Sequence, residues 1–189
     1  MDFGISHLDK KPVLETVFSK LKYSITLAVS SVFLVYLMSL PLGIWSAVNQ
    51  NTVKDRVITA ILFMLYSLPS YFTAVILLNL FSVQWEIFPS IGFESMEADQ
   101  MTTLQYIGDV AWHVTLPIVC MSYGSLAALS RYARTGLLDV IRADYIRTAR
   151  AKGLPEGIVI IKHAARNGMI PILTLMATLL PALIGGSVI

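Results

Sequence analysis

The sequence predicts an all-α polytopic membrane protein with about four transmembrane helices. Apolar residues make up 56% of the 189-residue chain and charged residues only 14%, whereas a typical soluble domain carries about 25% charged residues. Apolar runs close to 20 residues long recur along the chain, and a helix needs about that length to cross a bilayer. A single soluble core would leave several of these runs apolar on every side, with no face for water.

Residues 1–22 are polar and mixed in charge, and we expect them to form an extracytoplasmic amphipathic tail. After Pro12, apolar residues recur every three to four positions, which is typical of a short helix lying along the membrane surface. Residues 23–189 then form the transmembrane domain, and its first span is predicted over 23–48. Small residues in this span, such as Ser31 and Gly43, predict close helix packing, and Pro41 predicts a kink.

A polar turn over 49–56 leads to a second predicted span over 57–81. Ser67 and Pro69 in its middle predict a break or kink, and irregular backbone at membrane depth is tolerated only where protein or water covers it. This position is therefore either a packing kink or part of a transport pathway. The next loop, over 82–108, is acidic and contains no Lys or Arg.

The third span is predicted over 110–129 and contains Pro117, a further candidate for a kink or pathway position. His113 stands one turn inside the edge of this span, so an interfacial or helix-bonding role is favoured over a proton relay. The last span starts near residue 169 and runs to 189, with Pro171 as another candidate kink or pathway position. Because the chain stops at the end of an apolar run, we expect it to be a fragment.

The longest polar block, residues 131–168, holds eight of the fourteen Lys and Arg residues of the chain. With four spans, this block and the 49–56 turn lie on one side of the membrane, and the acidic loop lies on the other. The excess of positive charge predicts that the block is cytoplasmic. Charge alone favours a loop that is held by anionic lipid.

Within this block, helix signals stand on both sides of a glycine. Asp144 opens a stretch rich in Ala and Arg that runs to Lys152, and Gly153 follows it. Pro155, at a first helical position, begins the next helix. Ala149 and Gly153 would then set a helix–glycine–helix shape that a partner can grip, although this shape alone does not discriminate a protein partner from lipid.

Residues 145–154, together with the 163–168 stretch His-Ala-Ala-Arg-Asn-Gly and with Pro171, resemble the cytoplasmic EAA loop of ABC-importer permeases, most closely the dipeptide/oligopeptide class. The resemblance covers essentially the whole chain. Where the general pattern has Glu-Ala-Ala, this chain has Arg147, Thr148 and Ala149, and residues 163–166 replace the later Ile-x-Leu-Pro; the peptide-permease branch shares both departures. Further similar stretches follow in the same order: Asp2-Phe3-Gly4, Pro41-Leu42-Gly43-Ile44, Ser67-Leu68-Pro69 and residues 112–117.

The resemblance implies a fragment of a six-span permease in the bacterial inner membrane, which forms the translocation pathway for peptides or similar small solutes. The implied partners are a second permease subunit, two cytoplasmic ABC ATPase subunits and an extracytoplasmic solute-binding protein, with no nucleic acid among them. The chain itself binds no cofactor, and ATP and Mg belong to the ATPase. The residues implied to couple to the ATPase, within the 131–168 loop, are Asp144, Tyr145, Arg147, Thr148, Ala149, Arg150, Ala151, Lys152, Gly153, Leu154, His163, Arg166 and Asn167.

Two other classes of function compete with a transport subunit of this kind. An enzyme is disfavoured, because the sequence contains neither a P-loop motif, Gly-x-x-x-x-Gly-Lys-Ser/Thr, nor a His-Glu-x-x-His or Gly-x-Ser-x-Gly motif. An ion-coupled carrier or channel without an ATPase usually needs ionisable residues inside its spans. The predicted spans hold essentially none apart from Asp109 and His113 at one edge, and the carrier stays as the alternative.

Overall fold

The structure is a computed structural model that describes residues 3–6 and 10–176. Its regular secondary structure over these residues is helical, apart from one isolated β-bridge between Ile5 and Pro12. The elements in chain order are α1 (Val13–Val48), α2 (Val53–Ser67), α3 (Ser70–Leu78), η1 (Asn79–Gln84), η2 (Ala98–Gln100), α4 (Thr103–Ile141), α5 (Asp144–Ala151), α6 (Glu156–Ile158), η3 (Val159–Ala165) and α7 (Arg166–Gly168).

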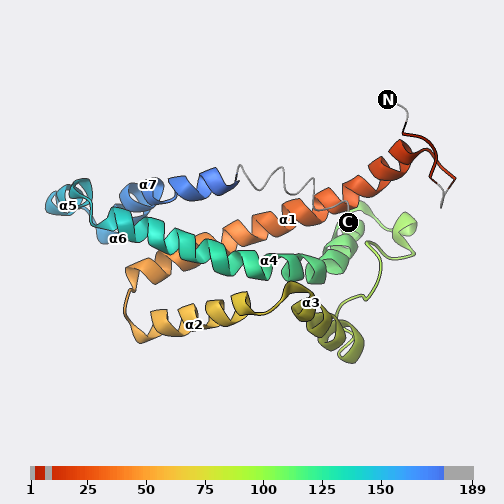
Figure 1. Cartoon of the computed structure of the whole chain (residues 1–189), viewed down its shortest axis with the longest axis horizontal. Coiled ribbons are helices and arrows are strands. Elements are labelled where there is room, and N and C mark those ends of the chain that lie inside the picture. The colour runs from red at the N-terminus through yellow and green to blue at the C-terminus, as the bar shows by residue number, and fades with distance from the viewer. Residues whose placement is uncertain (1–2, 7–9, 177–189) are drawn as a thin grey trace.

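The two longest helices, α1 and α4, pack against each other and form the centre of the molecule (Figure 1). At 36 and 39 residues, both are long and apolar enough to cross a membrane. Small residues line their contact, as predicted: a Cβ on Gly43 would collide with the Ala133 side chain, and the Ser122 hydroxyl donates to the Ser31 carbonyl oxygen at 3.2 Å. The helix α1 continues through Pro41 to its end at Val48.

One predicted boundary along these helices is wrong. The separate short helix predicted in the tail does not exist, because α1 begins at Val13 and runs directly into the predicted first span. No Gly or Pro stands between positions 13 and 23 to interrupt the backbone hydrogen bonds. The helix α4 continues past the predicted third span to Ile141, so that residues 131–141 of the basic block extend a membrane-spanning helix.

The predicted break in the second span is confirmed. The helices α2 and α3 meet at a bend of 96°, with Ser67 ending α2 and Pro69 standing directly before α3. The backbone freed by the bend is satisfied by side chains: the Tyr123 hydroxyl, from α4, donates to the Leu68 carbonyl oxygen at 2.8 Å, and the Ser67 hydroxyl donates to the Phe63 carbonyl oxygen at 2.8 Å.

A second bend lies close to Pro171, which the sequence offered as a kink or pathway position. The helical run from Glu156 to Gly168 meets the helical segment Ile170–Met176 at a bend of 47°. The remainder of the predicted last span, residues 177–189, lies outside the described residues. If each bent pair counts as one span, the described part of the chain holds up to four spans, which confirms an all-α polytopic membrane protein.

The acidic loop packs onto the ends of α1 and α4 that lie far from α5 (Figure 1). The Phe93 ring lies 4.7 Å from the Tyr23 ring of α1, and the Ser95 backbone N–H donates to the Asp109 carboxylate at 2.7 Å. The helix-bonding role predicted for His113 is confirmed, because its Nδ1 lies 2.9 Å from the Asp109 carbonyl oxygen one turn earlier.

Candidate functional site

The candidate site is the segment from α5 to α7. The helix α5 projects beyond the paired ends of α1 and α4, and α7 returns to lie beside α4 (Figure 1). The predicted helix, glycine turn and second helix are all present. After α5, the Gly153 backbone N–H donates to the Arg150 carbonyl oxygen at 2.9 Å, and Gly153 itself has a φ of 75°, which a residue with a Cβ adopts only at a cost. The helix α5 begins at Asp144, as predicted, whereas Pro155 stands just before α6 and not at its first helical position.

One face of α5 is buried against the chain's own helices. Ile146 is fully buried and Ala149 is only 6% exposed. They belong to a hydrophobic cluster that also contains Leu137 of α4 and Val159 and Ala164 of η3. Ala149 therefore faces this chain's own helices: it holds α5 in place, and its small side chain allows the close approach.

An ion pair closes the glycine turn. The Arg150 guanidinium donates to both carboxylate oxygens of Glu156, at 2.6 and 3.1 Å, so that the pair joins the end of α5 to the start of α6. The hydrogen bond from Arg150 holds the pKa of Glu156 below its usual value, and the same bond raises the pKa of Arg150. Both side chains are partly exposed, so solvent weakens the pair.

Side-chain hydrogen bonds also join α5 to the helices that follow. The Asn167 side-chain amide donates to the Tyr145 hydroxyl at 3.1 Å and to the His163 carbonyl oxygen at 3.4 Å. His163 is half-buried, and Arg166 is exposed. The predicted residues of the later stretch thus include one, Asn167, that positions α5.

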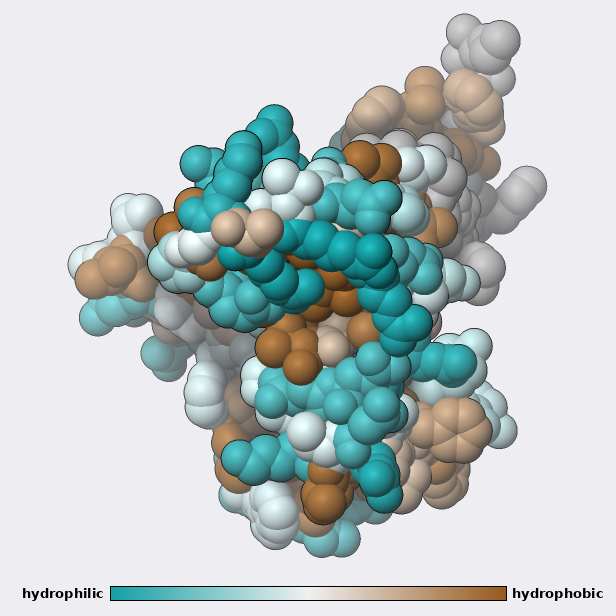
Figure 2. Space-filling view, turned by 90° about the vertical axis from the view of Figure 1, so that its left-hand side faces the viewer, coloured by the Kyte–Doolittle hydropathy of each residue, from teal (hydrophilic) through white to brown (hydrophobic). Residues whose placement is uncertain are grey.

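The outer face of α5 and its turn is exposed. The Asp144–Arg147 pair on this face joins two strongly exposed side chains at 3.3 Å, so it contributes little to stability. Figure 2 views the molecule from this end and shows a surface that is mostly hydrophilic around a smaller apolar area. The exposed residues among those predicted are Asp144, Tyr145, Arg147, Thr148, Arg150, Ala151, Lys152, Gly153, Leu154, Arg166 and Asn167.

Two glycines allow α7 to touch α4. A Cβ on Gly168 would lie 2.8 Å from the Gly136 carbonyl oxygen, and a Cβ on Gly136 would collide with the Gly168 carbonyl oxygen. Because neither position has room for a side chain, the two backbones meet directly. The segment that carries α5 is therefore seated on α4 at both of its ends.

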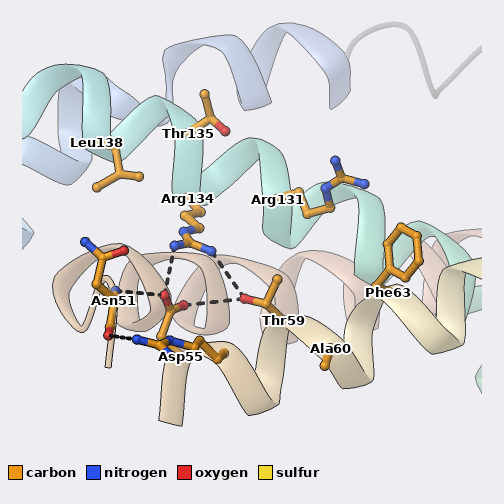
Figure 3. Close-up of a pocket in the computed structure, with 10 residues that line it drawn as sticks. Asn51, Asp55, Thr59, Ala60, Phe63, Arg131, Arg134, Thr135 and Leu138 are labelled. Atoms are coloured by element: carbon orange, nitrogen blue, oxygen red, sulfur yellow. Dashed lines mark hydrogen bonds and ion pairs between the residues drawn. The ribbon is translucent and has the colours of Figure 1, made fainter. Parts of the chain in front are cut away.

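The sequence reasoning missed a buried ion pair between α2 and α4 (Figure 3). The Arg134 guanidinium donates to the Asp55 carboxylate at 2.8 Å and to the Thr59 hydroxyl at 3.2 Å. Asp55 is 2% exposed, and it also accepts hydrogen bonds from the Ser46 hydroxyl at 2.5 Å and from the Asn51 backbone N–H at 3.2 Å. The pair therefore connects the end of α1 and the start of α2 to α4.

The candidate pathway residues do not come together at one place. Ser67 and Pro69 lie at the α2–α3 bend, and Pro171 lies at the later bend. Pro117 stands inside α4 and lines a hollow of about 200 Å³ with His113 and with Leu78 of α3. Within residues 3–6 and 10–176, no group of three or more His, Cys, Asp or Glu side chains is placed to hold a metal ion.

Known proteins resemble this chain over most of its length. Residues 39–189 match the family described as "Binding-protein-dependent transport system inner membrane component". The oligopeptide transport system permease protein AppB of Bacillus subtilis (strain 168) is 35% identical over 189 residues, which is 100% of this chain and 58% of AppB. The inner membrane ABC transporter permease protein YejB of Escherichia coli O157:H7 is 36% identical over 171 residues, which is 89% of this chain and 47% of YejB.

The glutathione transport system permease protein GsiC of Escherichia coli (strain K12) is 31% identical over 188 residues, which is 100% of this chain and 56% of GsiC. The chain thus spans about half the length of the curated relatives that it matches. The family match runs from within α1 to the last residue, and so the chain belongs to the family of inner membrane components of binding-protein-dependent transport systems.

Proposed function

We propose that this chain is part of a membrane-spanning permease subunit of an ATP-driven importer, which forms the translocation pathway for peptides or similar small solutes. The family and the names of the relatives, which include oligopeptide and glutathione permeases, support this class of function. ATP is hydrolysed by separate subunits, because the sequence has no P-loop motif. The subunit acts in the bacterial inner membrane, with a second permease subunit and an external solute-binding protein.

The observation that carries this proposal is the way α5 is held. Its inner face is fixed by Ile146 and Ala149, and its outer face and glycine turn are exposed beyond the ends of the spans. A helix that is fixed on one side and exposed on the other can transmit a movement of a bound protein to α4 and α1. We assign the exposed face of α5 as the surface that docks on a cytoplasmic ATPase.

A charge reversal on the exposed face tests this docking surface. We expect the double variant Arg147→Glu and Lys152→Glu to lower ATPase co-purification and solute uptake by about tenfold or more, since each reversal replaces an attraction by a repulsion. Both side chains are exposed, so the variant still folds. The matched control is Lys54→Glu, which reverses an exposed charge near the start of α2, outside α5.

The assay is uptake of labelled peptide by vesicles that contain the complete transporter, together with recovery of the ATPase in detergent. Loss of both readouts in the α5 variant, with neither lost in the control, supports the proposal. If no ATPase is recovered with the unaltered protein and an ion gradient drives uptake, the chain is an ion-coupled carrier instead. A second variant, Gly153→Pro, removes both the donated N–H and the positive φ of the turn, and we expect it to uncouple ATP hydrolysis from uptake.

A further inference from the structure

The segment over residues 79–93, which contains η1 and the turn after it, is apolar and lies open on the surface of the chain. Between positions 57 and 93 the only charged residue is Glu86, whereas three acids stand in the next six positions, 94–99. A contiguous exposed apolar surface marks a contact with a membrane or with another protein. The apolar side chains that the chain leaves exposed in this segment include Val83, Trp85, Ile87 and Ile91.

Four aromatic rings join this segment to α4. The Phe81 ring contacts the rings of Trp85 and Phe88, with centroids 5.0 and 6.3 Å apart, and the Phe88 ring lies 4.6 Å from the ring of Trp112 in α4. Because Trp112 is itself 49% exposed, the apolar surface of the segment continues onto the surface of a membrane-spanning helix. Tryptophan is enriched where a membrane meets water, since one end of its ring system is apolar and the other carries an N–H.

The backbone of the turn after η1 is closed by hydrogen bonds within the segment. The Phe81 carbonyl oxygen accepts from the Ile87 N–H at 2.8 Å and from the Phe88 N–H at 3.2 Å. The Ser82 hydroxyl donates to the Phe88 carbonyl oxygen at 2.7 Å. A loop in water has no need of such bonds, because water satisfies its backbone groups, whereas lipid offers them no partner. The turn is therefore built for a position against lipid.

The direction of the segment fits the same position. Figure 1 shows α2 lying along α4, and the 96° bend at the end of α2 turns α3 and η1 away from this direction, toward the membrane plane. We propose that the 79–93 segment lies in the lipid headgroup region on the side of the membrane opposite α5, with its exposed apolar side chains against lipid and residues 94–99 in water above it. Protein interfaces carry about one hydrogen bond per 100–200 Å², whereas this face is mainly apolar and offers one carboxylate, so lipid is the partner that it fits. This contact is independent of ATP-driven transport, because it involves neither α5 nor its turn.

The test is electron paramagnetic resonance of spin labels on the complete subunit with its partner subunits in phosphatidylcholine bilayers, after its other cysteines are replaced. One label stands at Ile91→Cys and the matched control at Met96→Cys. Both side chains are apolar and strongly exposed, at 90% and 106%, but they lie on opposite sides of the boundary between the apolar segment and the acids. We expect the label at position 91 to collide several times more often with lipid-soluble oxygen than with a water-soluble nickel chelate, and the label at position 96 to show the reverse preference.

Two outcomes of the labelling overturn the proposal. A preference for the nickel chelate at both positions means that the segment stands in water. Protection from both reagents at position 91 means that a protein covers it.

A second readout needs no label. Ile91→Asp places a charge against lipid, which is unfavourable, and should lower the midpoint of thermal unfolding in bilayers by several degrees. Met96→Asp adds the same charge on the water side and should leave the midpoint unchanged. Equal midpoints for the two variants would contradict the lipid contact, because both side chains are exposed within the chain.

Discussion

The short helices α5 and α3 differ in how much of their surface is buried within the chain. From composition alone, the apolar α3 would be expected to be the more buried helix, but α5 is. The eight residues of α5 include Asp144, Arg147 and Arg150, yet the helix buries Ile146 and Ala149 within the chain. The nine residues of α3 are almost all apolar, yet none is buried, and Tyr71 is 74% exposed. In a membrane protein, lipid or a partner can cover apolar surface, so an apolar helix need not pack against its own chain. Residues that are buried within the chain therefore show which helices are fixed to the rest of the molecule.

The same contrast extends to the whole end of the molecule that carries α5. This end of the molecule contains a buried ion pair, a contact of two glycine backbones and a hydrophobic cluster, all formed between different helices. The link from α2 to α3, in comparison, relies on the hydroxyls of Ser67 and Tyr123. We infer that the α5 end moves with α4 and α1, and that α3 adjusts to what surrounds it.

The largest expected effect comes from breaking the buried ion pair. Arg134→Met leaves Asp55, which is 2% exposed, without its charged partner, and breaking a buried pair costs about 3–5 kcal/mol of unfolding free energy. The measurement is chemical unfolding in detergent. Arg142→Met, which removes an exposed charge at the end of α4, is the control and should change stability by less than about 0.5 kcal/mol. Equal effects of the two variants would show that the pair does not fix this end.

A pair of identical substitutions compares α5 and α3 directly. Ile146→Ala removes a fully buried side chain from α5, and Ile76→Ala removes a side chain of α3 that is 45% exposed. We expect a loss of about 2–4 kcal/mol for the first, because a cavity remains, and under about 1 kcal/mol for the second. Both variants are measured in the same detergent. A larger loss for Ile76→Ala would reverse the comparison.

The glycine contact between α4 and α7 predicts that two Gly→Ala substitutions within α4 change the free energy of unfolding in opposite directions. Gly136→Ala places a Cβ against the Gly168 carbonyl oxygen, whereas a Cβ on Gly124, also in α4, meets nothing within 4 Å. We expect Gly136→Ala to destabilise by about 1–3 kcal/mol through overpacking. Gly124→Ala should stabilise by up to about 1 kcal/mol, because alanine is the better helix former. Thermal unfolding separates the two, and the same sign for both would exclude a tight contact.

The features that the sequence predicts well are those decided by neighbouring residues. The break at Ser67 and Pro69 and the turn at Gly153 follow from the backbone restrictions of proline and glycine, which act locally. The start of α2 was open to prediction too: Thr52 caps it by accepting a hydrogen bond from the Asp55 N–H, and a Thr with an acid three positions later is a common helix start.

The features that the sequence does not predict depend on packing between distant segments. Arg134 and Asp55 are 79 positions apart. The charge distribution predicted a cytoplasmic loop over 131–168, which included Arg134. Ala149 has the same residue type whether it faces a partner or its own helices, and only the position of η3 decides between them. Gly136 carries no signal of the Gly168 contact, because a glycine that touches a backbone and one that faces lipid look alike in a sequence.

The smallest expected effect concerns the ion pair at the glycine turn. The pKa of Glu156 is lowered by its hydrogen bond from Arg150, so the pair stabilises the turn at any pH above the ordinary glutamate pKa. This contribution is lost as the pH falls through the lowered pKa of the folded state, while Arg150 stays charged throughout. The helix α3 has no carboxylate, so its protection should not follow this titration.

Hydrogen exchange, corrected for the intrinsic effect of pH, measures the difference. We expect protection over residues 150–156 to decrease modestly on acidification in the unaltered protein. Glu156→Gln should show the weaker protection already at neutral pH and little further change, because glutamine keeps the shape but not the charge. Protection over residues 70–78 serves as the internal reference. If residues 150–156 in Glu156→Gln keep the protection and the pH response of the unaltered protein, then the buried face of α5, and not the ion pair, holds the turn closed.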